Sequence, residues 1–178
     1  GKKSYKLKEH LYVDGYNIIN SWESLKDKKA NSLEEARIEL IERLSEYHHY
    51  SGIDITVVFD AYDVKSGSGS EELYKGIRIV YTKEYETADH YIERILNELG
   101  RIKHIRVATS DRLEQEMVLS RGGIRVSARE LEVEIYNEMN MVKRHREHLN
   151  KQNNIYLERL NQDILNKLNK WNKSKDKS

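Results

Sequence analysis

Leu11-Tyr12-Val13-Asp14-Gly15-Tyr16-Asn17 is the stretch of sequence that decides the fold of this chain. A short apolar strand ends in an acid, and the glycine that follows permits a tight turn into a helix. Two later strands end in the same way: residues 53–59 lead into Asp60, and residues 104–108 lead into Thr109-Ser110-Asp111. Ligands of open α/β sheets bind beyond the carboxyl ends of the strands, where acids repel one another unless a cation lies between them. The pattern therefore predicts a site for Mg²⁺ or Mn²⁺, both of which are bound by oxygen ligands.

Strands alternate with helices over most of the chain. We expect strands at residues 10–14, 53–59, 77–81, 104–108 and 124–126, with a loop over 65–70. We expect helices to begin at the capping residues Ser32, Thr87, Ser110 and Ser127, and the first two to stop at Gly52 and Gly100. This alternation is typical of a parallel sheet covered on both faces. We therefore predict an α/β fold of three layers with a central, mainly parallel sheet, followed after about residue 128 by helix alone.

The composition excludes several classes of function. The 178 residues include no Cys, which excludes disulfides, thiol nucleophiles and zinc–thiolate sites and fits a reducing compartment. No apolar stretch approaches the roughly 20 residues that a membrane span requires. The first residues, Gly1-Lys2-Lys3-Ser4, lack the apolar core of a secretion signal. We therefore expect a cytoplasmic protein with no membrane partner.

Charge is distributed unevenly along the chain. From residue 141 onward there are ten Lys or Arg and four Asp or Glu, a formal charge of +6, against −5 for residues 1–140. Apolar residues recur at helical spacing in the basic part, so one helical face could dock onto the domain or onto a partner. Such a chain is typical of a metal-dependent head with a polyanion-binding extension, although a solvated helix fits the composition equally well. We expect the head at residues 8–135 and the basic helical extension at 136–178.

Four acids are candidate metal ligands. Asp14 ends a strand, and Asn17, one turn later, can orient a water molecule or a phosphate oxygen. Asp89 lies in the first turn of a helix, and Asp111 follows the strand at 104–108. Taken singly, each acid fits a helix cap or a partner for the helix dipole at least as well. Their coincidence at one sheet edge favours a metal site, in which Asp60 ranks below the other three acids.

Other motifs carry less information. Glu86 and Glu93 are possible outer acids around the same site. Gly67-Ser68-Gly69 lacks the Lys-Ser/Thr that a phosphate-binding P-loop requires. His48 and His49 are adjacent, so their side chains point about 100° apart on a helix and cannot share a metal ion.

Taken together, the motifs resemble those of a known family. The similar segments are Val13-Asp14-Gly15-Tyr16-Asn17, Val58-Phe59-Asp60, Thr87-Ala88-Asp89, Thr109-Ser110-Asp111 and Ser127-Ala128-Arg129-Glu130-Leu131. In this order they resemble the NYN branch of the PIN-like nucleases and, more narrowly, the bacterial YacP-like group. The resemblance covers about residues 10–135.

The resemblance implies a PIN-like domain that acts as an endoribonuclease, in that group on messenger RNA associated with the ribosome, in the cytoplasm. It implies a metal-binding catalytic set of Asp14, Asn17, Asp89 and Asp111. From its position after a strand we also count Asp60 among the acids that hold Mg²⁺ or Mn²⁺. We see no side chain suited to act as a base, so we expect water activated by the metal to be the nucleophile. Many PIN-like nucleases carry one more acid soon after the Ser-x-Asp segment. Because Arg112-Leu113-Glu114 follows here, we do not expect a further acid that binds the metal directly.

RNA should also contact basic side chains. We expect these contacts at Arg112, Lys65 and Lys75 in the head and at Lys143, Arg144 and Arg146 in the extension. Two other functions stay open. A phosphatase of the haloacid dehalogenase type needs a second Asp two residues after the first, and Tyr16 occupies that place. A non-catalytic module that binds RNA or the ribosome would be indicated by the loss of the carboxylates, which are present here.

Overall fold

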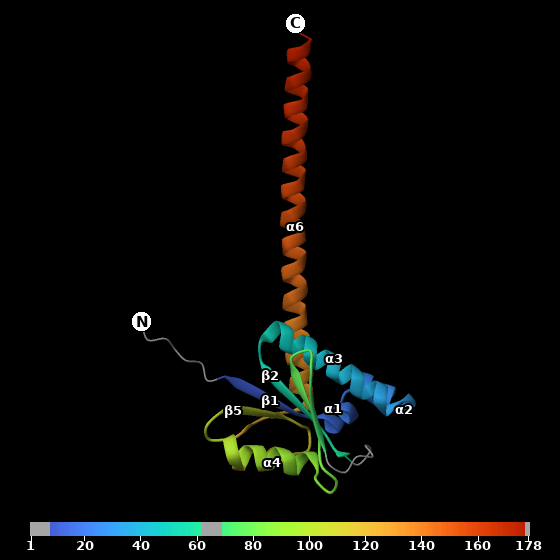
Figure 1. The fold of residues 1–178 in the computed structure, drawn as a ribbon, viewed down its shortest axis with the longest axis vertical. Helices are drawn as coiled ribbons and strands as arrows, with labels where there is room; N and C mark the ends of the chain where they lie inside the picture. Colours follow the sequence, from blue (N-terminus) through green and yellow to red (C-terminus); the bar gives the residue numbers. More distant parts are fainter. Residues whose placement is uncertain (1–7, 62–68, 177–178) are drawn as a thin grey trace, which may run out of the picture. The chain divides into compact units, whose positions relative to one another are not determined.

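The computed structural model of the chain describes residues 8–61 and 69–176, which contain one six-stranded sheet (Figure 1). The strands are β1 (Glu9–Asp14), β2 (Asp54–Phe59), β3 (Ser70–Tyr74), β4 (Ile77–Tyr81), β5 (His104–Ala108) and β6 (Ile124–Val126). Their order across the sheet is β3-β4-β2-β1-β5-β6. Every neighbouring pair is parallel except β3 and β4, which are antiparallel. The predicted α/β fold with a mainly parallel central sheet is therefore confirmed.

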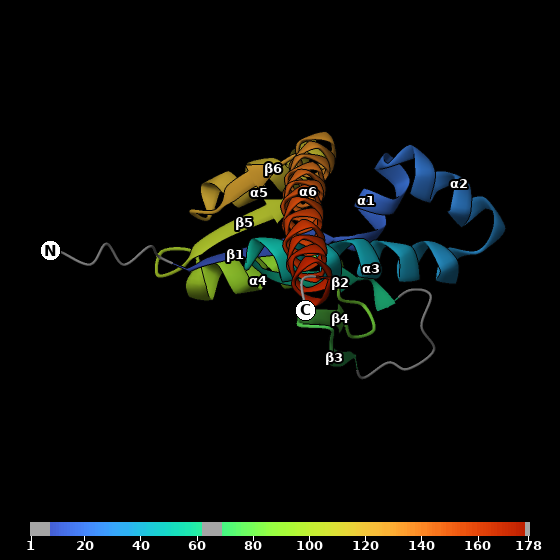
Figure 2. The same ribbon diagram turned by 90° about the horizontal axis from the view of Figure 1, so that it is seen from above.

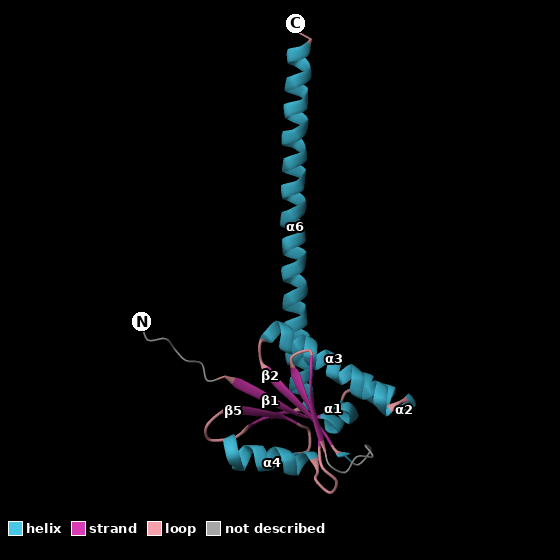
Figure 3. Cartoon of the chain, viewed as in Figure 1, coloured by secondary structure: helices cyan, strands magenta, loops and turns pink. Residues whose placement is uncertain are grey.

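Helices cover both faces of this sheet. They are α1 (Gly15–Ser21), α2 (Glu23–Asn31), α3 (Leu33–Ser51), α4 (Ala88–Leu99), α5 (Arg112–Ser120) and α6 (Ala128–Lys175), coloured cyan in Figure 3. Figure 1 shows α3 and α4 on opposite sides of the sheet, and Figure 2 gives the view from above. Between the sheet and the α4–α5 side, Tyr12, Val58 and Val107 pack with Ile92 and Val118 in a buried cluster. The fold thus has three layers, in the order helix, sheet, helix.

The helix ends follow the capping residues in most places. Ser32, Thr87 and Ser127 each accept a hydrogen bond from the backbone N–H three residues later, at 3.2, 3.2 and 3.0 Å. Gly52 ends α3 in the left-handed conformation, with φ of 72°. Local sequence chemistry therefore sets these boundaries, as we predicted.

The β3–β4 hairpin and α2 were not predicted. All five side chains of β3 are exposed, so this edge strand carries no apolar alternation that would indicate it. Lys75 and Gly76 form its two-residue turn with φ of 44° and 87°, as a type I′ hairpin requires. Ser70, which we assigned to a loop, already belongs to β3; residues 65–68 of that loop lie outside the described residues.

Two compact units make up the chain, residues 1–138 and 139–178, and α6 runs through the boundary. In the second unit α6 is a single uninterrupted helix, and its side chains from Lys143 to Lys175 are all exposed. Within the described parts of the chain, no helix combines the length and the apolar character needed to cross a membrane.

Candidate metal centre

Three carboxylates from three different elements meet beyond the carboxyl ends of the strands. Asp14 ends β1, Asp89 lies in the first turn of α4, and Glu114 lies in the first turn of α5. One oxygen atom of each lies within 4.8 Å of those of the other two. Asp14 and Glu114 are buried and Asp89 is half-buried. We call these three residues the acid cluster; its hard oxygen donors are suited to a divalent cation.

The alternation of β1 explains why Asp14 reaches the cluster. Successive strand residues point to opposite faces, so Asp14 shares the face of Tyr12, toward α4 and α5. Gly15 allows α1 to start directly against β2, because a Cβ atom there would lie 2.3 Å from Cε1 of Phe59. The Asp14 carboxylate also accepts a hydrogen bond from the backbone N–H of Asn17 at 3.4 Å. The turn that we recognised in the sequence thus fixes this acid in place.

Glu114 is the member of the acid cluster that the sequence analysis missed. We expected no further metal-binding acid after Asp111, yet Glu114 is only 2% exposed and lies beside Asp14 and Asp89. It precedes the buried Val118 by one helical turn, and this spacing was the available signal. Leu113 obscured that signal, because an apolar residue would be expected to face inward; it is instead 78% exposed.

A buried hydrogen bond holds the Glu114 carboxylate. The hydroxyl of Thr109, itself fully buried, donates to Glu114 Oε2 at 2.8 Å. Apart from the carboxyl groups of the acid cluster, the buried Glu114 Oε1 has no hydrogen-bond partner among the described residues. A buried oxygen without a partner is costly, and a divalent cation between the three carboxylates would provide one. The residues present therefore fit a Mg²⁺ or Mn²⁺ ion.

Burial and nearby negative charges both raise the pKa of Asp14 and of Glu114. Burial raises the pKa of Asp14 to about 6, and the negative charges of Asp89 and Asp60 add to the rise, while a hydrogen bond with Glu114 opposes it. Burial also raises the pKa of Glu114 strongly, and Asp14 and Asp89 raise it further. Without a cation Glu114 therefore retains its proton near neutral pH, and a bound cation would have to displace it.

Asp111 and Ser110 are placed differently from our expectation for the start of α5. Ser110 is not the cap of α5: the N-cap is Asp111, whose carboxylate accepts from the backbone N–H of Glu114 at 3.0 Å. The Ser110 hydroxyl oxygen instead accepts from the backbone N–H of Ala128, where α6 begins, at 3.1 Å. Asp111 is exposed and is not one of the three convergent acids. Its direct contact with a metal ion stays a prediction.

Asn17 and Asp60 tie neighbouring elements together at the same edge. Asn17 Oδ1 accepts from the backbone N–H of Ser110 at 2.7 Å, which joins α1 to the loop before α5. Asp60 Oδ1 accepts from the backbone N–H of Ala88 at 2.8 Å, which joins the end of β2 to the start of α4. Asp60 lies outside the group of three and raises the pKa of Asp14 through its charge, and its contact with a metal ion stays a prediction.

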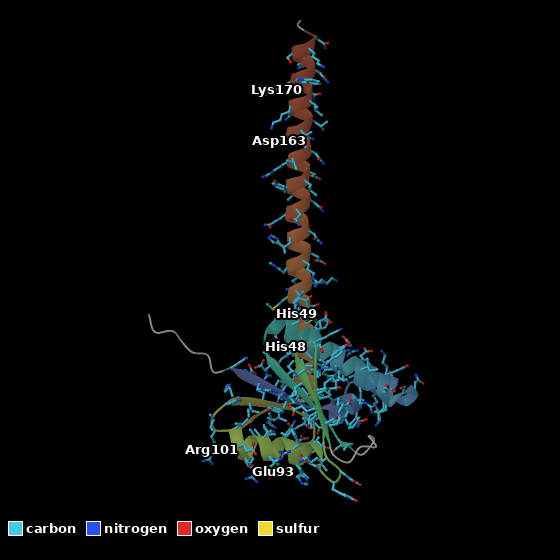
Figure 4. The ribbon with its side chains drawn as sticks, in the orientation of Figure 1. His48, His49, Glu93, Arg101, Asp163 and Lys170 are labelled. Carbon is cyan, nitrogen blue, oxygen red and sulfur yellow. The ribbon has the colours of Figure 1, made fainter. Side chains whose placement is uncertain are left out.

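The possible outer acids both form ion pairs. Glu86 pairs with Arg94, and Glu93 pairs with Arg121, each at 2.9 Å. Figure 4 labels Glu93 on α4. Both ion pairs are partly exposed, and such pairs contribute little to the stability of the fold.

The predicted RNA-binding residues lie in different parts of the chain. Arg112 is exposed in the first turn of α5. Lys75 lies at the amino end of β4, the edge opposite the acid cluster, and pairs with Glu42 at 3.1 Å. Lys65 lies outside the described residues. Three further cations are exposed on α6: Lys143, Arg144 and Arg146.

Comparison with known proteins identifies the family. The model of the YacP-like NYN domain matches residues 11–173 of this chain. The chain belongs to the YacP-like NYN family. Within this family, the YacP protein of Bacillus subtilis (strain 168) is 40% identical over 162 residues, which cover 90% of this chain and 95% of that protein. The sequence-based resemblance is therefore confirmed.

Solved structures agree with this family assignment. The crystal structure of Rae1 (YacP) from Bacillus subtilis is 39% identical and matches with a TM-score of 0.68, over 92% of this chain and 94% of that chain. A tryptophan-to-leucine variant of the same protein is 42% identical and matches with a TM-score of 0.67, over 76% of this chain and 80% of that chain. Membership of the YacP-like NYN family is consistent with a nuclease-like function, and the acid cluster could hold a divalent metal ion.

Proposed function

We propose that this chain is a metal-dependent endoribonuclease that hydrolyses phosphodiester bonds of RNA with Mg²⁺ or Mn²⁺. The observation that carries the proposal is the acid cluster, in which the buried Glu114 lies beside two more carboxylates and its Oε1 has no described partner outside the cluster. The nuclease-like family supports RNA as the substrate. Asp14, Asp89 and Glu114 would hold the cation, and Asp111, which caps the helix that carries Glu114, is a further predicted ligand.

The residues around the cluster have distinct tasks in this reaction. When bound, the cation would lower the pKa of water and neutralise the charge that develops on the phosphate group. Thr109 occupies Oε2 of Glu114 and so leaves Oε1 for the site. The side-chain Oδ1 of Asn17 accepts from the backbone N–H of Ser110, and the side-chain NH₂ group of Asn17 would orient a water molecule or a phosphate oxygen. Arg112, exposed on the same edge, would pair with a neighbouring phosphate.

The extension supports a ribosomal location for the substrate. We infer that messenger RNA on the ribosome, in the cytoplasm, is cleaved, because the segment from residue 141 carries a charge of +6. Lys143, Arg144 and Arg146 are all exposed on α6, where they can contact phosphates of ribosomal RNA. Phosphate contacts supply affinity without sequence information, which suits docking onto a large RNA surface.

Cleavage of a labelled single-stranded RNA by the purified full chain tests the proposal. We expect cleavage to stop in EDTA, to return with Mn²⁺, and to be lost in Asp14→Asn and Asp89→Asn. The matched control is Asp163→Asn, which removes an exposed carboxylate from α6 and should leave cleavage unchanged. Circular dichroism should show that all three variants are folded. Full activity in EDTA, or in the Asp14→Asn/Asp89→Asn double variant, would contradict the proposal.

A further inference from the structure

Tyr85 has an unusual combination of exposure and backbone conformation. Its side chain is 95% exposed, and its φ is +66°, in the left-handed region that residues other than glycine rarely adopt. Among the described residues, Lys75 is the other non-glycine residue with positive φ, and its two-residue hairpin turn requires that conformation. Tyr85 lies in no hairpin, so its conformation needs another explanation.

The turn that carries Tyr85 is held in place by hydrogen bonds at both ends. The backbone N–H of Glu86 donates to the carbonyl of Lys83 at 3.0 Å, which makes Tyr85 the third residue of a four-residue turn. Gly or Asn is favoured where the third residue of a turn has a positive φ, whereas this chain has Tyr85 at that position. The Thr82 hydroxyl donates to the Glu86 carbonyl at 2.7 Å, and the Thr82 N–H donates to the carbonyl of Phe59 at 3.0 Å. The turn therefore presents the tyrosine ring to solvent from an anchored backbone.

The same loop leads to a member of the acid cluster. It runs from the carboxyl end of β4 into α4, and Asp89 follows Tyr85 by four residues. Beside the loop lies a hollow of about 350 Å³ whose charged lining residues are Lys83, Arg94, Glu71 and Glu86. Within this hollow Arg94 pairs with Glu86. The loop thus carries an exposed aromatic ring and an exposed cation, Lys83, which precede Asp89 of the acid cluster by four and six residues.

We propose that Tyr85 is a stacking platform for an unpaired nucleobase of RNA whose phosphate lies at the acid cluster. This inference rests on the proposed endoribonuclease function. Every base offers a π face, so stacking on tyrosine binds single-stranded RNA with little sequence preference. A base inside a duplex is already stacked and paired, so the platform selects single-stranded substrate. A role of the Tyr85 ring in RNA binding explains why the chain keeps a strained backbone conformation in this exposed turn.

Three substitutions at Tyr85 test the proposal by fluorescence anisotropy with a labelled single-stranded RNA, all in full-length Asp14→Asn protein so that no cleavage intervenes. Tyr85→Ala should weaken binding roughly 5- to 150-fold, the range for loss of one base–aromatic stack. Tyr85→Phe keeps the ring and should bind within about twofold of the parent. A duplex RNA of the same sequence should bind the parent and Tyr85→Ala equally, and the salt dependence should not change because no phosphate contact is removed.

Tyr85→Gly separates stacking from a structural role. Glycine adopts positive φ without strain, so this variant should melt at a higher temperature than the parent and yet bind single-stranded RNA as weakly as Tyr85→Ala. A lower melting temperature of Tyr85→Gly, or unchanged binding of single-stranded RNA by Tyr85→Ala, would overturn the stacking inference. Either result would leave the proposed endoribonuclease function unaffected. If the wild-type protein with Mn²⁺ neither binds nor cleaves single-stranded RNA, the proposed function fails and the inference fails with it.

Discussion

Glu114 shows how one hydrogen bond can prepare a carboxylate for a cation. The Thr109 hydroxyl donates to one oxygen of this buried side chain, and the other oxygen has no described partner outside the acid cluster, whose other members are Asp14 and Asp89. Asp14 and Asp89 could be predicted because each follows a strand or opens a helix. Glu114 could not, because α5 has apolar residues on several sides and the sequence does not say which side faces the sheet.

Substitution of two neighbouring acids separates metal binding from helix capping. Glu114→Gln should lower the affinity for Mn²⁺ at least tenfold, because it removes a negative oxygen ligand from the acid cluster. Asp111→Asn keeps a good N-cap, so it should change the affinity only if Asp111 itself contacts the metal ion. Isothermal titration with Mn²⁺ measures both. An unchanged affinity in Glu114→Gln would remove Glu114 from the metal site.

The raised pKa of Asp14 predicts a pH-dependent stability in the absence of metal. The folded protein keeps a proton on Asp14 up to about pH 6, whereas the unfolded chain releases it near pH 4, so folding stability falls as pH rises across this interval. Asp14→Asn has no such proton and should become more stable than the wild type above pH 6, by on the order of 1–3 kcal/mol. Urea unfolding in EDTA at pH 4 and pH 7.5 measures the difference.

The control for this pH experiment is internal. Burial lowers the pKa of His10 to about 4, which acts in the opposite direction: it favours the fold at higher pH and is lost as pH falls. Both proteins carry His10, so its contribution cancels in the comparison. A wild type that is more stable than Asp14→Asn at pH 7.5 in EDTA would show that repulsion in the acid cluster is not a cost to folding.

At the scale of elements, prediction succeeded where apolar residues and caps agree. The buried strands and the helices that begin at Ser32, Thr87 and Ser127 were predicted because burial or a capping hydroxyl leaves a local pattern. The strand β3 was missed because it is an exposed edge strand, held by backbone pairing to β4 that no side-chain pattern records. The cap of α5 was placed one residue early because Ser110 and Asp111 are both good N-caps.

The close approach of α1 to β2 can be tested at Gly15. Gly15→Ala would place a Cβ atom against the ring of Phe59, so either the ring or the start of α1 must move. We expect a loss of stability of about 1–3 kcal/mol, as for other overpacked cores, and a weaker Mn²⁺ affinity because Asp14 precedes this turn. Urea unfolding and Mn²⁺ titration measure the two effects.

Gly52→Ala serves as the comparison for this prediction. Gly52 has a positive φ but no atom within 4 Å of the added Cβ, so its substitution should reduce stability without any change in metal binding. Stability and Mn²⁺ affinity in Gly15→Ala that both equal the wild type would show that the turn tolerates a side chain.

At the scale of the whole molecule, an acidic head and a basic extension have separate roles in our account. The head holds the acid cluster, and α6 carries exposed cations together with half-exposed apolar side chains, among them Leu157, Leu160, Ile164 and Leu168. Their three- and four-residue spacing places these four on one face of the helix. What covers that face could not be predicted from the sequence, since spacing alone fits a partner or the domain itself.

Neutralising the extension should weaken RNA binding through charge alone. Changing Lys143, Arg144, Arg146, Lys151 and Arg159 to Gln should reduce affinity for ribosomes or RNA and flatten the salt dependence, whose log–log slope for five phosphates is roughly −3.5 to −4.5. Mn²⁺ affinity should be unchanged. Changing Asn150, Asn153, Asn154, Asn161 and Asn166 of the same helix to Gln is the charge-neutral control. Equal affinity and slope in both variants would show that the extension is only a solvated helix.

Anomalous diffraction from a crystal of the full chain soaked in Mn²⁺ will show whether Asp14, Asp89 and Glu114 together bind the catalytic cation. We expect an anomalous peak roughly 2.0–2.2 Å from one carboxylate oxygen of each of these residues. A peak bound elsewhere on the chain, or none at the acid cluster at saturating Mn²⁺, would contradict this expectation.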